Sequence, residues 1–168
     1  MLYGICALLA LAGLGLDQWL KHYVTVNIPL GEAQDFLPGI LELRTVHNYG
    51  AAWSSFSGMR WLLVAVTTAI VVVVAYLLVQ RIVRHPLGVI ACSMVISGGV
   101  GNIIDRVRLG YVVDMFHFEF WPSYPVFNVA DIFVVGGAIL GAVYYLWFYE
   151  KYDKKDKIHG KNTSAGDN

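Results

Sequence analysis

The chain has 168 residues, 57% of them hydrophobic and 14% charged, with 12 Lys and Arg balanced by 12 Asp and Glu. This length suggests one domain, the apolar content excludes a disordered protein, and the zero net charge excludes a polybasic nucleic-acid binder. The two cysteines, Cys6 and Cys92, lie within apolar runs and imply no disulfide scaffold. Charged residues are absent from four long stretches: 2–16, 61–80, 85–104 and 132–149.

The first apolar stretch predicts a membrane-spanning helix over about residues 2–24. Asp17 and Lys21 interrupt the end of this stretch, so we expect the helix to continue past its last uncharged residue. A cleaved signal peptide is the alternative for residues 1–16, because Ala-Leu-Ala at 10–12 resembles a cleavage site. No Lys or Arg precedes the apolar run, however, and three more spans follow it, which favours a retained span.

An outward-facing loop is expected between the first two spans, over residues 25–60. Within it, Leu41-Glu42-Leu43-Arg44-Thr45 alternates apolar and polar side chains with period two. This alternation is typical of a short strand with one solvated face. We therefore expect short strands in this loop.

The second apolar run, at 61–80, is the clearest sign of a membrane protein. A helix of 18–20 residues covers roughly 27–30 Å, the hydrocarbon thickness of a bilayer, whereas strands rarely exceed about ten residues. The run also lacks the alternation of a membrane β-barrel strand. The same reasoning predicts spans at 86–105 and 131–149.

Basic residues indicate which way the spans face, because they concentrate on the cytoplasmic side of a membrane. Arg81 and Arg84 follow the second span. Five lysines follow the fourth: Lys151, Lys154, Lys155, Lys157 and Lys161. Both chain termini are therefore predicted to be cytoplasmic, and the stretches 22–60 and 106–130 to face outward.

The predicted fold class is an all-α membrane protein with four transmembrane helices and a small extracytoplasmic β-element. Residues 1–150 form the membrane domain in this interpretation, and residues 151–168 form a polar cytoplasmic tail. The composition of 153–168 is typical of a disordered segment.

Four of the acidic residues are predicted at or near the outer ends of the spans. These residues are Asp17, Asp105, Asp114 and Asp131. Ionisable groups at membrane depth are costly, and they are functional candidates for that reason. For Asp17, a structural role is favoured over a functional one. Lys21 lies four residues further on the same helix face, so the two can form an interfacial ion pair in which the lysine snorkels.

Asp105 shares a helix face with Asn102 and is followed by Arg106. Two interpretations stay open for this group. It could be a buried polar network that orients other groups, or a clamp on a substrate.

Asp114 and Asp131 lack a basic neighbour at helical spacing and are flanked by apolar residues. Asn128 is a natural N-cap, which places Asp131 in a first helical turn where the helix dipole favours negative charge. The alternative for Asp131 is therefore that its charge only complements the helix dipole and has no catalytic role. Asp114 has no such partner, so we expect it to be protonated or to share a proton. Two carboxyls in contact suit aspartic-protease chemistry, although a contact between residues 17 apart cannot be deduced from their spacing.

Other chemistries find little support in the sequence. No HExxH or Cys/His ligand spacing is present, so we expect no metal, and no GxSxG motif surrounds the serines at 54–57. Gly137 and Gly141 form a GxxxG pattern that favours close helix packing. A proton-coupled transporter and a structural assembly factor remain the alternatives from other classes.

The chain closely resembles the lipoprotein signal peptidase (signal peptidase II) family over nearly its whole length. The resemblance rests on five blocks in order: Asp17-Gln18 with Lys21; Asn48-Tyr49-Gly50-Ala51-Ala52-Trp53-Ser54; Gly98-Gly99-Val100-Gly101-Asn102-Ile103-Ile104-Asp105-Arg106; Gly110-Tyr111-Val112-Val113-Asp114-Met115-Phe116; and Phe127-Asn128-Val129-Ala130-Asp131. Five ordered blocks are specific where one alone would be weak.

The resemblance implies an aspartic endopeptidase of the bacterial cytoplasmic membrane with its site toward the outer face. Its partner would be a diacylglyceryl-modified prolipoprotein, cut just before the lipidated cysteine to release the signal peptide. Carried over by motif, Asp114 and Asp131 are the catalytic pair. The implied substrate-binding and supporting residues are Asn48, Gly50, Asn102, Asp105, Arg106, Asn128, Asp17 and Lys21. No cofactor, metal or nucleic acid is expected, and a monomer surrounded by membrane lipids is the expected state.

Overall fold

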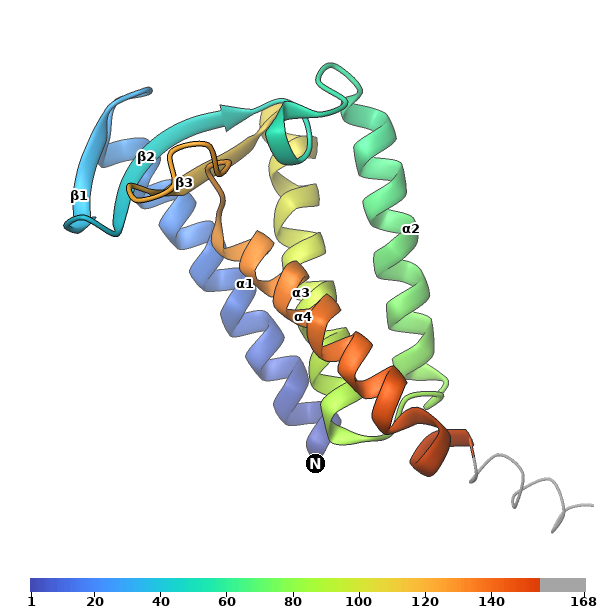
Figure 1. The fold of residues 1–168 in the computed structure, drawn as a ribbon. Helices are drawn as coiled ribbons and strands as arrows, with labels where there is room; N and C mark the ends of the chain where they lie inside the picture. The colour runs from blue at the N-terminus through green and yellow to red at the C-terminus, as the bar shows by residue number, and fades with distance from the viewer. Residues whose placement is uncertain (155–168) are drawn as a thin grey trace, which may run out of the picture.

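Four long helices and a three-stranded sheet make up residues 1–154, the part of the chain that the computed structural model describes (Figure 1). The helices are α1 (Leu2–Asn27), α2 (Arg60–Val79), α3 (Pro86–Leu109) and α4 (Val129–Trp147). The strands are β1 (Ala33–Leu37), β2 (Leu41–Asn48) and β3 (Val112–Phe118), and two short helical turns are η1 (Ala52–Ser54) and η2 (Tyr149–Lys154). All four long helices have the length and apolar composition to cross a membrane, so the predicted fold class is confirmed.

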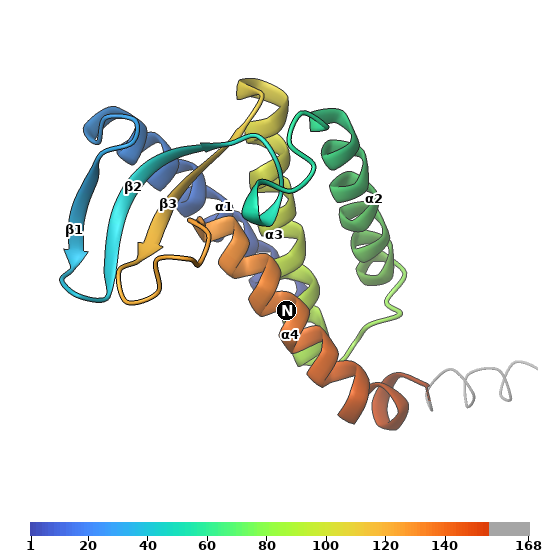
Figure 2. The same ribbon diagram turned by 45° about the horizontal axis from the view of Figure 1, so that its top comes forward.

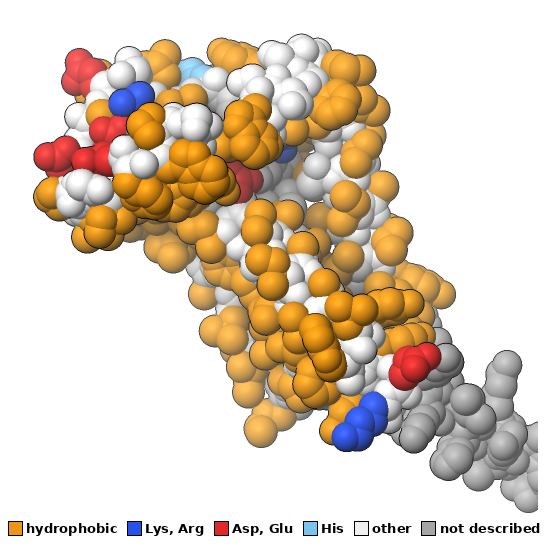
Figure 3. All heavy atoms as spheres, in the orientation of Figure 1, with side chains coloured by type: hydrophobic (Ala, Val, Ile, Leu, Met, Phe, Trp, Pro, Cys, Tyr) orange, Lys and Arg blue, Asp and Glu red, His pale blue; other side chains and the backbone are white. Residues whose placement is uncertain are grey.

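The sheet lies at one end of the helices, which we call the sheet end (Figure 1). The N-terminus and η2 lie at the opposite end, the tail end. Between the two ends the visible face of the helices is covered by hydrophobic side chains, and the charged side chains lie mainly toward the ends (Figure 3). This distribution is what a bilayer requires, because lipid tails cannot solvate charge.

Helix α3 is the central helix and packs against α1, α2 and α4. Its glycines explain how closely its neighbours approach. A Cβ atom on Gly98 would lie 2.2 Å from the carbonyl oxygen of Ala130 in α4, and one on Gly99 would lie 2.6 Å from Val71 Cγ2 in α2. The predicted close packing is confirmed at Gly137, where an added Cβ would lie 2.8 Å from the carbonyl oxygen of Ala91 in α3. At each of these glycines a larger side chain would push the helices apart.

The sheet is antiparallel in the order β1–β2–β3. Two of its strands lie in the loop 25–60, where short strands were expected, but β3 belongs to the stretch 106–130, for which no strand was predicted. The sequence Val112–Phe118 lacks a regular alternation because both of its faces are largely buried. Thr45 ties the sheet to α1 by donating to the carbonyl oxygens of Val24 (3.0 Å) and Ile28 (2.8 Å).

The tail end is ordered further than the sequence suggests. The carboxylate of Asp153 is buried and accepts hydrogen bonds from the backbone N–H groups of Arg84 and His85, and from the hydroxyl of Tyr144. The prediction that disorder begins at residue 153 is wrong for this position, because these donors hold the side chain. The rest of the predicted tail, 155–168, lies outside the described residues.

Candidate active site

Asp114 lies on β3, opposite Val46 of β2, and its side chain is 2% exposed. Two amides hold its carboxylate. Asn48 Nδ2 donates to Asp114 Oδ2 at 2.9 Å, and Asn128 Nδ2 donates to Asp114 Oδ1 at 2.7 Å. The expectation of an isolated carboxyl is thus refined: within residues 1–154 no cation contacts Asp114 directly, but two neutral donors fix its orientation.

Asp131 lies in the first turn of α4, where Asn128 is the N-cap residue as predicted. Asn128 Oδ1 accepts from the backbone N–H of Asp131 at 2.8 Å, and Asp131 Oδ2 accepts in return from the backbone N–H of Asn128 at 3.2 Å. This reciprocal capping box fixes the start of the helix and the position of the carboxylate. Asn102 of α3 donates to the other oxygen, Asp131 Oδ1, at 2.8 Å.

Asn128 joins the two aspartates. Its side-chain amide donates to Asp114, and its backbone N–H donates to Asp131. The same side-chain amide lies 3.2 Å from Asn102 Oδ1, so a chain of amides runs behind the pair. The fold therefore brings residues 114 and 131 to the two sides of one asparagine, which their spacing could not reveal.

The environment of Asp114 favours a bound proton. Burial, which disfavours the charged form, is the main cause that raises the pKa of Asp114 to about 7, and the nearby negative charge of Asp131 acts in the same direction. The hydrogen bonds from Asn48 and Asn128 oppose this shift only in part. One carboxyl that keeps its proton near neutral pH beside a second carboxyl is the arrangement that acid–base hydrolysis needs.

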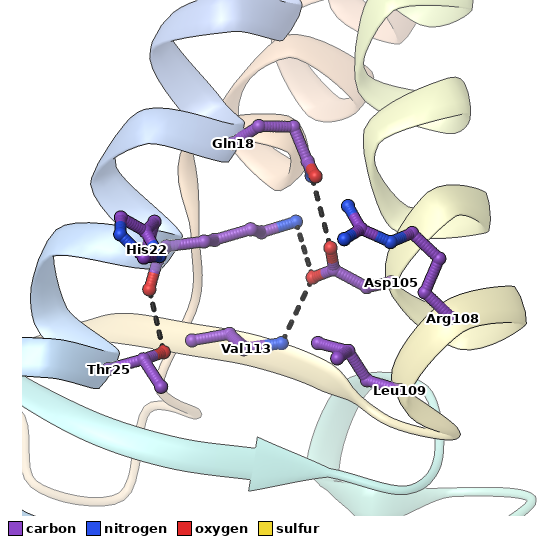
Figure 4. Close-up of a pocket in the computed structure, with 8 residues that line it drawn as sticks. Gln18, His22, Thr25, Asp105, Arg108, Leu109 and Val113 are labelled. Atoms are coloured by element: carbon purple, nitrogen blue, oxygen red, sulfur yellow. Dashed lines mark hydrogen bonds and ion pairs between the residues drawn. The ribbon is translucent and has the colours of Figure 1, made fainter.

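A buried ion-pair network adjoins these amides, and Figure 4 shows its contacts at Asp105. Lys21 Nζ lies 2.9 Å from Asp17 Oδ2 and 3.0 Å from Asp105 Oδ2, and it also donates to Asn102 Oδ1 at 3.1 Å. The predicted pair of Asp17 with Lys21 is present, but the predicted snorkelling is wrong, because Lys21 is 3% exposed. Its ammonium turns inward since α3 supplies a second carboxylate there.

Asp17 and Asp105 each also fix a second element. Asp17 Oδ1 accepts from the backbone N–H of Ala130 at the start of α4, at 2.8 Å. Asp105 Oδ2 accepts from the backbone N–H of Val113 on β3, at 3.1 Å. The network thus positions the residues next to Asp114 and Asp131. Gln18, which was not among the predicted site residues, donates to Asp105 Oδ1 at 3.0 Å.

The structure confirms the buried-network interpretation for two members of the group around Asp105, and the substrate clamp stays a prediction for Arg106. Asn102 and Asp105 belong to the buried network. Arg106 instead lines a cavity and donates from Nη2 to the carbonyl oxygen of Gly50 at 2.9 Å. That bond links α3 to the segment after β2, which passes beside α3 between the sheet and α2 in Figure 2.

The cavity has a volume of about 360 Å³ and contains both aspartates in its lining. Asn48, Asn102 and Arg106 also line it. Its remaining walls come from α2, α4 and the segment 124–127, which the sequence did not indicate as part of a site. These wall residues are largely apolar: Leu63, Ile70, Val71, Val126, Phe127, Val134 and Val135 are among them. The molecule is visibly hollowed below the sheet between α4 and α2 (Figure 3).

The arrangement is suited to activating a water molecule. Two buried carboxyls at one asparagine can divide a single proton, so that one accepts a proton from water while the other donates. Within residues 1–154, no three His, Cys, Asp or Glu side chains are grouped as a metal site would require.

Known proteins with similar sequences and folds are consistent with this chemistry. The family model described as Signal peptidase (SPase) II matches residues 9–148. A lipoprotein signal peptidase of Enterococcus faecalis is 42% identical over 148 residues, which is 88% of this chain and 88% of that protein. One of Lactococcus lactis is 40% identical, over 76% of this chain and 84% of that protein. A solved bacterial membrane enzyme, 28% identical, superposes with a TM-score of 0.80 over 85% of this chain and 88% of that one.

Proposed function

The chain belongs to the signal peptidase II family, and from that premise we propose that Asp114 and Asp131 hydrolyse the peptide bond as an aspartic pair. Membership makes the protein a membrane-embedded peptidase that removes signal peptides from prolipoproteins. Membership in this family therefore argues against the two hypotheses from other classes, a proton-coupled transporter and a structural assembly factor. The single observation that carries the catalytic assignment is the placement of both carboxyls on Asn128, inside one cavity.

In the proposed first step, a water held between the carboxyls attacks the carbonyl carbon of the scissile bond. Asp131, at the N-terminus of α4 where the helix dipole favours negative charge, takes a proton from that water. Asp114, whose burial favours the protonated form, donates its proton to the carbonyl oxygen. The product of this step is a neutral tetrahedral diol.

In the second step, the carbon–nitrogen bond breaks. Asp131 gives its proton to the leaving nitrogen, and one diol hydroxyl returns its proton to Asp114 as the carbonyl reforms. The pair ends with the same protons with which it began. No covalent bond to the protein forms in this scheme.

The asparagines and the buried network act as positioning residues in this proposal. Asn48, Asn102 and Asn128 orient the two carboxyls by direct hydrogen bonds. Asp17, Lys21 and Asp105 hold α4 and β3 in place around them. Arg106 lines the cavity and holds Gly50 next to it, where a substrate backbone would enter.

We assign the diacylglyceryl-modified cysteine of the prolipoprotein to this cavity. Its walls on α2 and α4 are apolar and continue into the span of the helices, which suits acyl chains. A substrate already anchored in the bilayer loses less translational freedom when its scissile bond meets a fixed pair of carboxyls. The site is formed by one chain, so a monomer suffices.

The sheet end is proposed to face the outside of the cell. The connection between α2 and α3, which contains Arg81 and Arg84, and η2, which contains Lys151, lie at the tail end (Figure 1), and basic residues favour the cytoplasmic side. This orientation puts both termini in the cytoplasm and the site at the outer boundary, where a lipidated cysteine resides.

Purified protein in detergent tests the proposal with a matched pair of substrates. A diacylglyceryl-modified prolipoprotein should be cut immediately before the lipidated cysteine, which mass spectrometry of the product identifies. The same precursor without lipid should be a poor substrate. Equal rates on the two forms would contradict lipid-guided positioning, and a cut elsewhere in the precursor would contradict the assigned bond.

A further inference from the structure

A loop over residues 119–127 joins β3 to α4 and forms one wall of the catalytic cavity. In Figure 2 it is the orange loop that returns from the end of β3 to the start of α4. Four consecutive residues of this loop line the cavity: Tyr124, Pro125, Val126 and Phe127. None of the catalytic or positioning residues assigned above belongs to the loop.

The end of the loop next to α4 is held by the backbone of β3. The N–H groups of Met115 and Phe116 both donate to the carbonyl oxygen of Phe127, at 3.0 and 2.8 Å. The N–H of Phe127 donates in return to the carbonyl oxygen of Phe116 at 3.0 Å. Asn128 follows directly, and its capping box holds the start of α4. The bonds that fix the catalytic pair therefore do not involve residues 119–126.

The middle of the loop is held by His117 of β3. This residue is 8% exposed, and its ring Nε2 lies 3.4 Å from the carbonyl oxygen of Pro122. The other ring nitrogen, Nδ1, lies 2.8 Å from Oε1 of Glu42, which is opposite His117 in the register of β2 and β3. Both partners are acceptors, so each contact requires an N–H group on the ring. His117 thus links the loop to the sheet.

Glu42, the partner of His117 in the sheet, is itself held in place. Arg44 forms an ion pair with it, in which Arg44 Nε lies 2.6 Å from the same Oε1 atom. Both residues belong to β2, the central strand of the sheet. The carboxylate that orients His117 is therefore fixed on the most constrained of the three strands.

A second ring nitrogen contacts the next carbonyl of the loop. Trp53 Nε1, in η1, donates to the carbonyl oxygen of Ser123 at 3.4 Å, and the Trp53 ring meets Tyr124 edge-on at 6.3 Å. Trp53 is 69% exposed, whereas His117 is buried. Water competes with an exposed hydrogen bond, so His117 is the stronger of the two constraints on the loop.

We propose that His117 is a positioning residue for substrate binding. Supported by Glu42, it holds the loop at Pro122 and thereby determines where the cavity wall of residues 124–126 meets the precursor beside the scissile bond. This inference rests on the proposed function, which assigns the precursor to the cavity. Because the catalytic pair is fixed separately, loss of the link should weaken substrate binding and leave the chemical step nearly unchanged.

Hydrogen exchange measured by mass spectrometry tests the link itself, on the full chain in detergent and without substrate. His117→Phe keeps a ring but removes both nitrogens. Amide exchange in 119–126 should become about tenfold faster, as the loss of one hydrogen bond predicts, while exchange in α3 stays at the wild-type rate. His22→Phe makes the same change at an exposed position of α1 and should leave exchange in the loop unchanged.

Cleavage of a lipidated prolipoprotein tests the role in binding. His117→Phe should raise KM about tenfold and keep kcat within about twofold, because the wall contacts the substrate but not the reacting atoms. His117→Gln retains an amide donor and should restore part of the lost binding. Glu42→Leu should also raise KM. The double variant should be no worse than His117→Phe alone, since the two residues act as one link.

The possible failures are distinguishable. Unchanged exchange in His117→Phe would overturn the link, and faster exchange with an unchanged KM would overturn its role in binding. A fall in kcat alone would show that the loop acts on the catalytic pair instead. Additive effects of His117→Phe and Glu42→Leu would show that Glu42 does not act through His117. A wild type that does not cut the lipidated precursor would contradict the proposed function, and the role in binding with it, whatever the exchange rates.

Discussion

Around the two aspartates, the donors are neutral. Within residues 1–154, every side-chain hydrogen bond to Asp114 or Asp131 comes from an asparagine: Asn48, Asn102 or Asn128. An amide orients a carboxylate without adding a full positive charge beside it. Lys21, the buried cation of the network, reaches the pair through Asn102 and not by direct contact. This separation lets burial raise the pKa of Asp114 and keep a proton available.

The pH dependence of cleavage should show whether Asp114 must carry this proton. With the pKa of Asp114 at about 7, its protonated share and the cleavage rate should fall as the pH rises through that value. Asn48 stabilises the charged form, so Asn48→Ala should raise the pKa and move the alkaline limb of the rate profile to higher pH. Asn27→Ala removes an exposed amide that donates to the carbonyl oxygen of Tyr23, away from the aspartates, and should leave the limb in place. A limb that is unmoved or shifted to lower pH in Asn48→Ala would contradict the role of Asp114 as the acid.

Lys21 should be a large contributor to stability. Lys21→Met leaves Asp17 and Asp105 buried without their cation, and breaking a buried pair in this way costs about 3–5 kcal/mol. Thermal unfolding in detergent should show a clearly lowered midpoint. Lys151→Met, at an exposed position, serves as the matched control. Similar midpoints for the two variants would show that the network does not hold α1 to α3.

Among the helices and strands, α3 determines where the elements that carry the site lie. It contacts the other three long helices, and its glycines allow α4 to approach until Gly98 meets the carbonyl of Ala130, next to Asp131. The position of one catalytic carboxyl therefore depends on the absence of a side chain on a neighbouring helix.

Gly98→Ala tests that dependence. The added Cβ would meet backbone at 2.2 Å and must displace α4, at a cost of about 1–3 kcal/mol for overpacking. Because a shift of about 1 Å can cost about a hundredfold in rate, cleavage should fall by more than stability alone explains. Gly15→Ala, which has no atom within 4 Å of its new Cβ, should keep full activity. Full activity in Gly98→Ala would mean that the α3–α4 distance does not set the geometry of the site.

The elements differ in how far the sequence could predict them. The four spans can be predicted from their long uncharged runs, because a soluble protein would have to bury each of these apolar runs in its core. Strand β3 could not be found in the same way, because both of its faces are buried and its alternation is lost. Its partner β2 lies over sixty residues earlier, so the pairing is a property of the assembled chain.

The residues of the site also differ in how far the sequence could predict their contacts. Asn128 as a helix cap and the pair of Asp17 with Lys21 are local features, and spacing predicts them. The meeting of Asp114 with Asp131 requires β3 to pass beside the start of α4, and the burial of Lys21 requires Asp105 from another helix. Such contacts were beyond the local pattern. The five motif blocks located the residues, and the fold supplies the physical reason why they belong together.

For the molecule as a whole, orientation in the membrane is the remaining proposal. Single cysteines at Glu32, before β1, and at Lys151, in η2, would lie at opposite ends of the molecule; Cys6 and Cys92 would be replaced by alanine. In intact cells, an impermeant maleimide should label Glu32→Cys and spare Lys151→Cys until the membrane is opened. Labelling of Lys151→Cys from outside would reverse the assigned orientation.

The most direct test of the account is the cleavage rate of the two single carboxyl-to-amide variants on a lipidated prolipoprotein. Asp114→Asn and Asp131→Asn keep the shape of the side chain but remove the proton exchange, so each should slow cleavage by about a thousandfold or more while the unfolding midpoint stays close to that of the wild type. Asp35→Asn, on the exposed strand β1, should cleave at the wild-type rate. Cleavage within about tenfold of the wild type by either Asp114→Asn or Asp131→Asn would contradict the aspartic pair.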